Sequence, residues 1–166
     1  MSVCQHLKHP VPPVWDASCE TLILGSFPSV KSREVGFFYG HPQNRFWRVL
    51  SHVLDCPLPA TIPEKREMLL SHHIALWDVI AECDIVGSSD SSIRNARPND
   101  IESLIRGSRI SRIFVNGATA EKLYGAYLFP ILRLRAVRLP STSPANAAWN
   151  IERLTDAWRV IGGTPQ

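Results

Sequence analysis

The sequence lacks the motifs of the common metal, nucleotide and hydrolase sites. Its 166 residues include only four cysteines, which are far apart and form no C-x-x-C pair. The ligand spacing of zinc and iron–sulfur sites is therefore absent. There is also no Gly-rich phosphate loop, no H-E-x-x-H and no G-x-S-x-G motif. These absences exclude most standard enzyme classes, and we expect neither a metal nor a cofactor.

Long apolar runs are missing as well. No run approaches the roughly 18 residues that a membrane-spanning helix needs. The first 13 residues hold histidine, lysine and proline where a signal peptide would be apolar. With 45% hydrophobic and 20% charged residues, the composition is that of an ordinary globular protein, and the scattered cysteines are typical of reduced thiols. We therefore expect a cytoplasmic protein that has no membrane contact and acts as a monomer.

The chain shows no internal repeat and no low-complexity tract that would separate domains. Its length matches one domain. We therefore expect a single domain over residues 1–166, in which residues 1–18 form a peripheral N-terminal segment. One polar stretch, residues 82–99, has few apolar anchors and is predicted to be a long functional or mobile loop.

Short apolar runs alternate with helical patterns along the chain. The runs typical of buried strands are residues 21–24, 74–80, 113–117 and 135–139. The helical patterns are residues 45–54, 63–71, 100–105, 118–127 and 146–160. This alternation predicts an α/β fold with three layers, in which helices flank a short central, mainly parallel sheet of four strands.

Polar or turn-forming residues follow each predicted strand, at the sheet edge where α/β proteins bind their ligands. They are Gly25 to Pro28, Asp78, Asn116 and the segment 140–144. Residues 36–47 add aromatic rings beside Asn44 and Arg45, which would suit a flat heteroaromatic ring next to a phosphate. Alternatively the rings belong to the core. We interpret Phe46 and Trp47 in this second way, and both interpretations stay open for Phe37, Phe38 and Tyr39.

Arginine dominates the basic residues, which number 18 against 15 acidic ones. Arginines gather near positions 45–48, 94–97 and 133–138. Their guanidinium groups suit bidentate contacts with phosphate, and the alternative is an ordinary solvated surface.

Three blocks taken together resemble the uracil-DNA glycosylase superfamily. They are Leu-Gly-Ser-Phe-Pro-Ser (24–29), Gly-Phe-Phe-Tyr-Gly-His-Pro-Gln-Asn-Arg-Phe-Trp (36–47) and Leu-Pro-Ser-Thr-Ser-Pro-Ala-Asn (139–146). Within the superfamily the chain is most similar to the hypoxanthine-DNA (deoxyinosine) glycosylase branch, and the second block is also similar to mismatch-specific uracil glycosylases. The resemblance covers about residues 21–159. It implies a monofunctional DNA glycosylase that hydrolyses the N-glycosidic bond of a deaminated base in double-stranded DNA, hypoxanthine first, in base excision repair.

The resemblance also implies where the water is held. The superfamily carries an Asp or Asn in the turn after the first strand, and that position is Phe27 here. A phenylalanine cannot orient water, so the resemblance transfers the catalytic role to Asn44. The alternative is that Asn44 only caps the helix that follows it.

The remaining site residues are assigned from the same resemblance. The turn Gly25, Ser26 and Phe27 would border the base, Tyr39 would stack on it with Phe38 as its neighbour, and Ser141 stands where uracil enzymes have a histidine. Asp78 would accept the N1–H of hypoxanthine, and Asn116 is a weaker candidate donor to O6; Asp78 could instead cap a turn. The loop that enters the duplex and its phosphate contacts would comprise Arg45, Ser143, Pro144, Ala145 and Asn146, and a simple turn before the last helix is the alternative.

Other functions remain open from the sequence. They are the removal of uracil or xanthine from mismatches, the binding of damaged DNA without catalysis, and an enzyme of free nucleosides.

Overall fold

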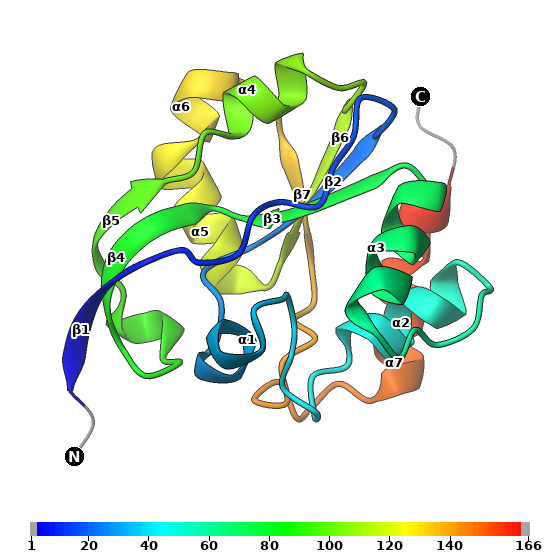
Figure 1. Cartoon of the computed structure of the whole chain (residues 1–166), viewed down its shortest axis with the longest axis horizontal. Helices are drawn as coiled ribbons and strands as arrows, with labels where there is room; N and C mark the ends of the chain where they lie inside the picture. The colour runs from blue at the N-terminus through cyan, green and yellow to red at the C-terminus, as the bar shows by residue number, and fades with distance from the viewer. Residues whose placement is uncertain (1–2, 164–166) are drawn as a thin grey trace.

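The computed structural model describes residues 3–163, and a parallel sheet of four strands lies at its centre (Figure 1). The strand order is β3 (Ile74–Asp78), β2 (Thr21–Gly25), β6 (Arg112–Asn116) and β7 (Ala136–Leu139), and each neighbouring pair is parallel. β2 is buried over its whole length, as its continuous apolar run predicts. The predicted sheet is confirmed.

Helices cover both faces of this sheet, because alternate strand residues point to opposite sides. Ile23, Leu76 and Phe114 pack in one core cluster with α2 (Phe46–Val53), α3 (Ile62–Ser71) and α7 (Ile151–Trp158). Their strand neighbours, such as Leu22 and Val115, pack in a second cluster with residues of α4 (Ile101–Arg106) and α5 (Ala118–Tyr127), and α6 (Phe129–Leu132) follows α5 on that side. Figure 1 shows the two helix groups on opposite sides of the strands. The three-layer α/β/α class is confirmed.

Residues 82–99 do not form the long loop that their polarity predicts. The run expected as one strand over residues 74–80 ends at Asp78, and the chain continues as β4 (Ile80–Val86). This strand lies in a second, antiparallel sheet, between β1 (Cys4–Lys8) and β5 (Arg94–Pro98). The hairpin closes through a short 3-10 helix, η1 (Asp90–Ser92), and returns as β5 (Arg94–Pro98). Its polarity reflects one exposed face, on which Glu82 pairs with Arg97, while Cys83 and Ile85 on the other face are buried.

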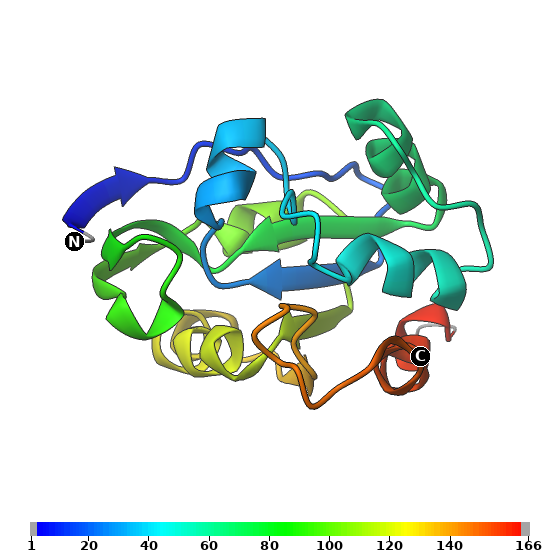
Figure 2. The same ribbon diagram turned by 90° about the horizontal axis from the view of Figure 1, so that it is seen from below.

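The N-terminal segment is more than the periphery that we expected. β1 (Cys4–Lys8) is an exposed strand paired with β4, and Figure 2 shows it at the end of the molecule away from the C-terminus. The residues after it lie against the central sheet: Val11 and Val14 are buried, and Val14 bridges Leu76 of β3. Three prolines within residues 10–13 interrupt any strand or helix periodicity, which is why the sequence conceals this core contact.

Local capping sets the remaining helix ends. Ser29 caps α1 (Val30–Val35), a helix that we did not expect, and Gly36 ends it at φ 80°. Thr61 and Glu64 form a capping box at α3. The predicted helix 146–160 begins only at Ile151, where Asn150 caps α7, and a second 3-10 helix, η2 (Arg159–Gly162), follows it. No helix among the described residues is long and apolar enough to cross a membrane.

Candidate active site

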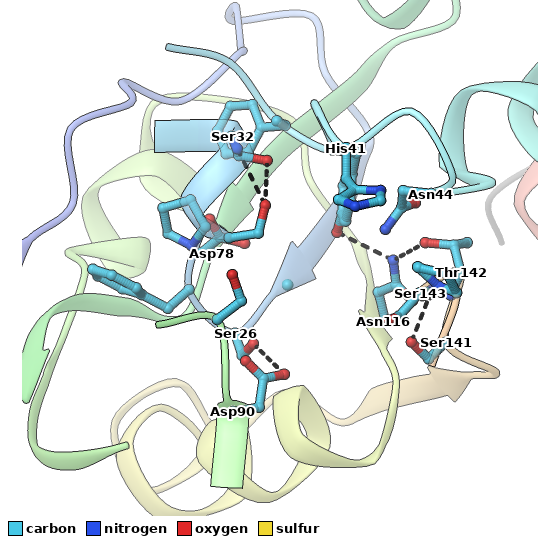
Figure 3. A pocket seen from close by; sticks show the side chains of 18 residues that line it. Ser26, Ser32, His41, Asn44, Asp78, Asp90, Asn116, Ser141, Thr142 and Ser143 are labelled. Atoms are coloured by element: carbon cyan, nitrogen blue, oxygen red, sulfur yellow. Dashed lines mark hydrogen bonds between the residues drawn. The ribbon is translucent and has the colours of Figure 1, made fainter. Parts of the chain in front are cut away.

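A cavity of about 230 Å³ opens at the carboxyl ends of the parallel strands (Figure 3). It is smaller than the roughly 300–1,000 Å³ typical of sites for drug-sized ligands. Eleven of the fourteen residues selected from the sequence line it: Gly25, Ser26, Phe27, Phe38, Tyr39, Asn44, Asp78, Asn116, Ser141, Ser143 and Pro144. Ala145 and Asn146 line a neighbouring depression, and Arg45 lines neither.

Asp78, at the end of β3, supplies a carboxylate to the cavity. Its side chain is only 6% exposed, and its Oδ2 lies 2.7 Å from Nε2 of His9. Its Oδ1 lies over Gly25, where an added methyl group would overlap it and would lie 2.9 Å from the Tyr39 hydroxyl oxygen. The missing side chain at Gly25 therefore leaves room for one free carboxylate oxygen on the cavity wall.

Tyr39 and its neighbours combine core and cavity roles. Phe46 and Trp47 are buried, as predicted, and so is Phe38, which also lines the cavity. Tyr39 has φ 52° and packs one ring face on Phe46 at 4.0 Å between centroids, which leaves only its other face for the stacking that we expect. Burial, together with the charge of Asp78, raises the pKa of the Tyr39 phenol well above its usual value, so the hydroxyl keeps its proton.

Asn116 holds the site together rather than facing a base. Its Nδ2 donates to the Tyr39 hydroxyl at 3.2 Å and to the Thr142 hydroxyl at 3.0 Å. Its Oδ1 accepts from the backbone N–H of Thr142 at 3.1 Å. Both amide hydrogens are thus used within the protein, which differs from the donor to O6 that we expected, and Asn116 instead fixes Tyr39 and the loop after β7.

Asn44 caps a helix and also lines the cavity. Its Oδ1 accepts from the backbone N–H of Phe46 at 2.9 Å, which caps the first turn of α2. With the oxygen so engaged, the amide NH₂ is the group left for a water or a substrate atom, an orientation assigned from this hydrogen bond. In Figure 3, Asn44 and His41 lie on one side of the cavity, and Asp78, Ser26 and Asp90 lie on the other.

Arg45 braces the loop 140–150 and does not point toward a phosphate. Its guanidinium donates to the backbone carbonyls of Ser143 at 2.8 Å, Asn146 at 3.1 Å and Trp149. The expected phosphate contact of Arg45 is therefore replaced by a structural one, since its planar fork of donors is taken up by protein carbonyls.

We expect Arg45→Lys to lower the free energy of unfolding by about 1–3 kcal/mol, because a single ammonium cannot satisfy these separated carbonyls. Urea denaturation measures the change. The matched control is Arg48→Lys, at an exposed position of the same helix α2, which should leave stability unchanged. Equal stability of the two variants would contradict the bracing role.

Seven residues that line this cavity were not selected from the sequence: Pro28, Ser29, Ser32, His41, Ser88, Asp90 and Thr142. Asp90 brings a carboxylate, and His9, the partner of Asp78, was missed as well. Asp90 belongs to η1, and its Oδ2 accepts from the Ser26 hydroxyl at 2.9 Å. The residue is exposed as a whole, but its carboxyl faces the cavity. There burial raises its pKa, the hydrogen bond from Ser26 opposes the rise, and the charge of Asp78 adds to it. A lone Asp in a polar run gave no signal, because only the β4–β5 hairpin brings it to Ser26.

We expect Asp90→Asn to stabilise the protein at neutral pH. A raised pKa means that the folded state holds this proton more tightly than the unfolded chain, so stability falls as the pH rises from the ordinary value of 3.8 through the folded pKa. Thermal unfolding should show a higher Tm than wild type at pH 7 and no difference at pH 3. Asp100→Asn is the control, and we expect it to lower the Tm at pH 7, because hydrogen bonds from Ser103 lower the pKa of Asp100.

The described residues offer no site for a metal. No group of three or more histidine, cysteine, aspartate or glutamate side chains within residues 3–163 is arranged to hold one. The four cysteines are unpaired.

Comparison with known proteins places this arrangement in a family. The model of the uracil DNA glycosylase superfamily matches residues 12–161. A hypoxanthine DNA glycosylase of Methanosarcina acetivorans is 35% identical over 160 residues, which cover 93% of this chain and 98% of the relative. A hypoxanthine DNA glycosylase of Methanosarcina barkeri is 35% identical over 144 residues, which cover 84% of this chain and 88% of the relative.

A solved structure agrees with these matches. A solution NMR structure from Methanosarcina acetivorans has a TM-score of 0.78 and 30% identity, over 96% of this chain and all of the other. The resemblance in the three sequence blocks is thus confirmed over nearly the whole length, and the chain belongs to the uracil-DNA glycosylase superfamily.

Proposed function

We propose that this protein is a monofunctional DNA glycosylase that removes hypoxanthine from deoxyinosine in double-stranded DNA, as the first step of base excision repair. The observation that carries the proposal is the free Oδ1 of Asp78 on the wall of a small cavity. The names of the Methanosarcina relatives, which match most of the chain, support it.

A carboxylate at this position suits deaminated bases. Deamination of adenine turns the ring nitrogen N1 from a hydrogen-bond acceptor into an N–H donor, and deamination of cytosine does the same to N3. An ionised carboxylate is an acceptor only. Asp78 therefore attracts the N1–H of hypoxanthine and repels the bare N1 of adenine, which distinguishes the damaged base from the normal one.

The reaction follows from what the cavity holds. The target nucleotide leaves the base stack at a cost of a few kcal/mol, which is lowest for a mispaired base. Bond cleavage then places negative charge on the base and positive charge on the sugar, so fixed dipoles at the cavity wall stabilise the transition state. The NH₂ of Asn44 holds the attacking water. None of the described residues that line the cavity is a lysine, which favours hydrolysis by water over a Schiff base.

The loop 140–150 enters the duplex at the site of the extruded base. Pro144 and Ala145 are exposed at its tip, and its rigid shape is held by Arg45 and Asn116 from behind. A small apolar wedge on a braced loop is suited to filling the space that the base vacates. We propose that the enzyme does this as a monomer in the cytoplasm, where unpaired cysteines are the normal state.

The decisive experiment is single-turnover base release from end-labelled duplexes that carry one inosine, uracil, xanthine or adenine at the same position. We expect release of hypoxanthine to be the fastest and release of adenine to be undetectable. Release of uracil without release of hypoxanthine would show that uracil, and not hypoxanthine, is the substrate. Duplex binding without any release would make the protein a binder of damaged DNA, and activity on free deoxyinosine that is indifferent to salt would make it a nucleoside enzyme.

A further inference from the structure

We infer that His9 is a positioning residue that keeps Asp78 as an ionised, acceptor-only group, and that this pair selects bases with a ring N–H. The inference rests on the proposed function and names what sets its specificity. His9 belongs to the N-terminal segment and not to any of the three sequence blocks. It reaches Asp78 because the segment that contains it lies against β3.

The hydrogen bonds of His9 define which of its ring nitrogens carries the hydrogen. The backbone N–H of Val11 donates to Nδ1 at 3.1 Å, so Nδ1 presents its lone pair and carries no hydrogen. The remaining hydrogen of the neutral ring is then on Nε2, which donates to Oδ2 of Asp78 at 2.7 Å. His9 is thus a neutral donor in one tautomer, and Asp78 accepts at Oδ2 as a carboxylate.

Burial makes this hydrogen bond difficult to replace. The side chains of His9 and Asp78 are 3% and 6% exposed. Aromatic rings surround the imidazole: Phe27 and Trp77 meet it edge-on at 5.8 and 6.4 Å, and Phe38 lies at 6.1 Å. Phe27, which stands where the superfamily has an Asp or Asn, therefore forms part of the wall that keeps water away from the pair.

Within residues 3–163, His9 is the side chain that hydrogen-bonds the Asp78 carboxylate. The other ionisable groups that face it are the protonated Tyr39 hydroxyl and the Asp90 carboxyl, and neither is a cation. Asn99 donates to the backbone carbonyl of Asp78 at 2.9 Å and not to its carboxylate. With Oδ2 bound by His9, the carboxylate cannot rotate freely, and Oδ1 stays directed over Gly25.

The pair selects among bases because Asp78 would be protonated without His9. A buried carboxylate that loses its donor takes up a proton. A protonated acid can donate a hydrogen bond, and it would then accept the bare N1 of adenine as a partner. His9 prevents this, so only a base that brings its own ring hydrogen finds a partner at Oδ1.

Direct NMR of the whole protein tests the inference without any substrate. Long-range ¹H–¹⁵N correlation of His9 is expected to show the neutral tautomer with hydrogen on Nε2 at pH 7. A charged imidazolium at pH 7, or hydrogen on Nδ1, would overturn the inference even if the protein releases hypoxanthine. Conversely, this result could be as expected while wild type releases no base, which would overturn the proposed function alone.

Two variants test the consequence for catalysis. His9→Phe keeps a flat ring but removes the donor, and His9→Gln places an amide N–H near the position of Nε2. We expect His9→Phe to release hypoxanthine at least about tenfold more slowly than wild type at pH 7, with a smaller deficit at pH 9 because a higher pH favours the ionised form of any carboxylate. We expect His9→Gln to stay within about threefold of wild type at each pH.

The control is His6→Phe, which removes an exposed histidine of the same N-terminal segment. His6 also contacts a carboxylate, since its Nδ1 lies 2.6 Å from Oδ1 of Asp84 in β4. It should leave the rate and its pH profile unchanged. A loss in His9→Phe that is equal at every pH and is not rescued in His9→Gln would show a structural role only and would overturn the inference, as would a wild-type profile in His9→Phe.

Discussion

Replacement of Asn44 with alanine is expected to lower the single-turnover rate of hypoxanthine release by about 10²–10³-fold. In the proposed reaction the amide of Asn44 holds the attacking water, since the side chain of Phe27 supplies no polar atom in the turn after β2. The loss should appear in the rate of the chemical step and not in the affinity for the inosine duplex. End-labelled cleavage assays and fluorescence anisotropy on the same duplex measure the two separately.

The helix cap complicates this variant, and Asn44→Ser resolves it. Loss of the bond from the Phe46 N–H to Asn44 Oδ1 should cost about 0.5–2 kcal/mol of stability in Asn44→Ala. Serine is also a good capping residue but brings no amide into the cavity. We expect wild-type stability in Asn44→Ser and a loss of rate as large as in Asn44→Ala. If serine restored the rate, Asn44 would act through the cap alone.

The sequence was informative where one element carries its own pattern. The strand β2 is a continuous apolar run that is buried on both faces, and the polar residues after β2, β3 and β6 follow directly from the rule that parallel strands end at one edge. Asp78 could therefore be placed in the site before the structure, whereas Asn44 was placed there only by the resemblance in residues 36–47. The aromatic block yielded its core residues because Phe46 and Trp47 begin a helical stripe.

The sequence was silent where a function depends on a distant partner. His9 lies in a proline-rich segment without periodicity, and it gains meaning only from Asp78, which is 69 positions away. Arg45 adjoins the site in sequence, yet its donors bind carbonyls about a hundred residues further on. Asn116 fits the pattern of a base reader, and only the positions of Tyr39 and Thr142 show that its donors are occupied. The roles of these three residues depend on partners that are distant in the sequence and are brought close only by the fold.

Gly25→Ala should abolish most of the activity, by at least about 10²-fold, since misplacement of a reacting group by about 1 Å has an effect of this size. The new methyl group would overlap Oδ1 of Asp78 and press on the Tyr39 hydroxyl. The described glycines with positive φ are Gly36, Gly87 and Gly117, and Gly25 is not one of them. Alanine at Gly25 therefore strains the backbone little, and the effect comes from lost space. Single-turnover release of hypoxanthine measures it.

Gly125→Ala is the matched control for this variant. Gly125 lies in α5, is exposed, and would place its new methyl group in open space. It should keep full activity and gain about 0.5–1 kcal/mol of stability from the better helix former. Because Asp78 cannot move away without breaking its bond to His9, we expect Gly25→Ala to impair duplexes with hypoxanthine, uracil and xanthine alike. Loss for hypoxanthine and xanthine with uracil spared would mean that the methyl group blocks purines by size, and that the carboxylate does not read the shared ring N–H.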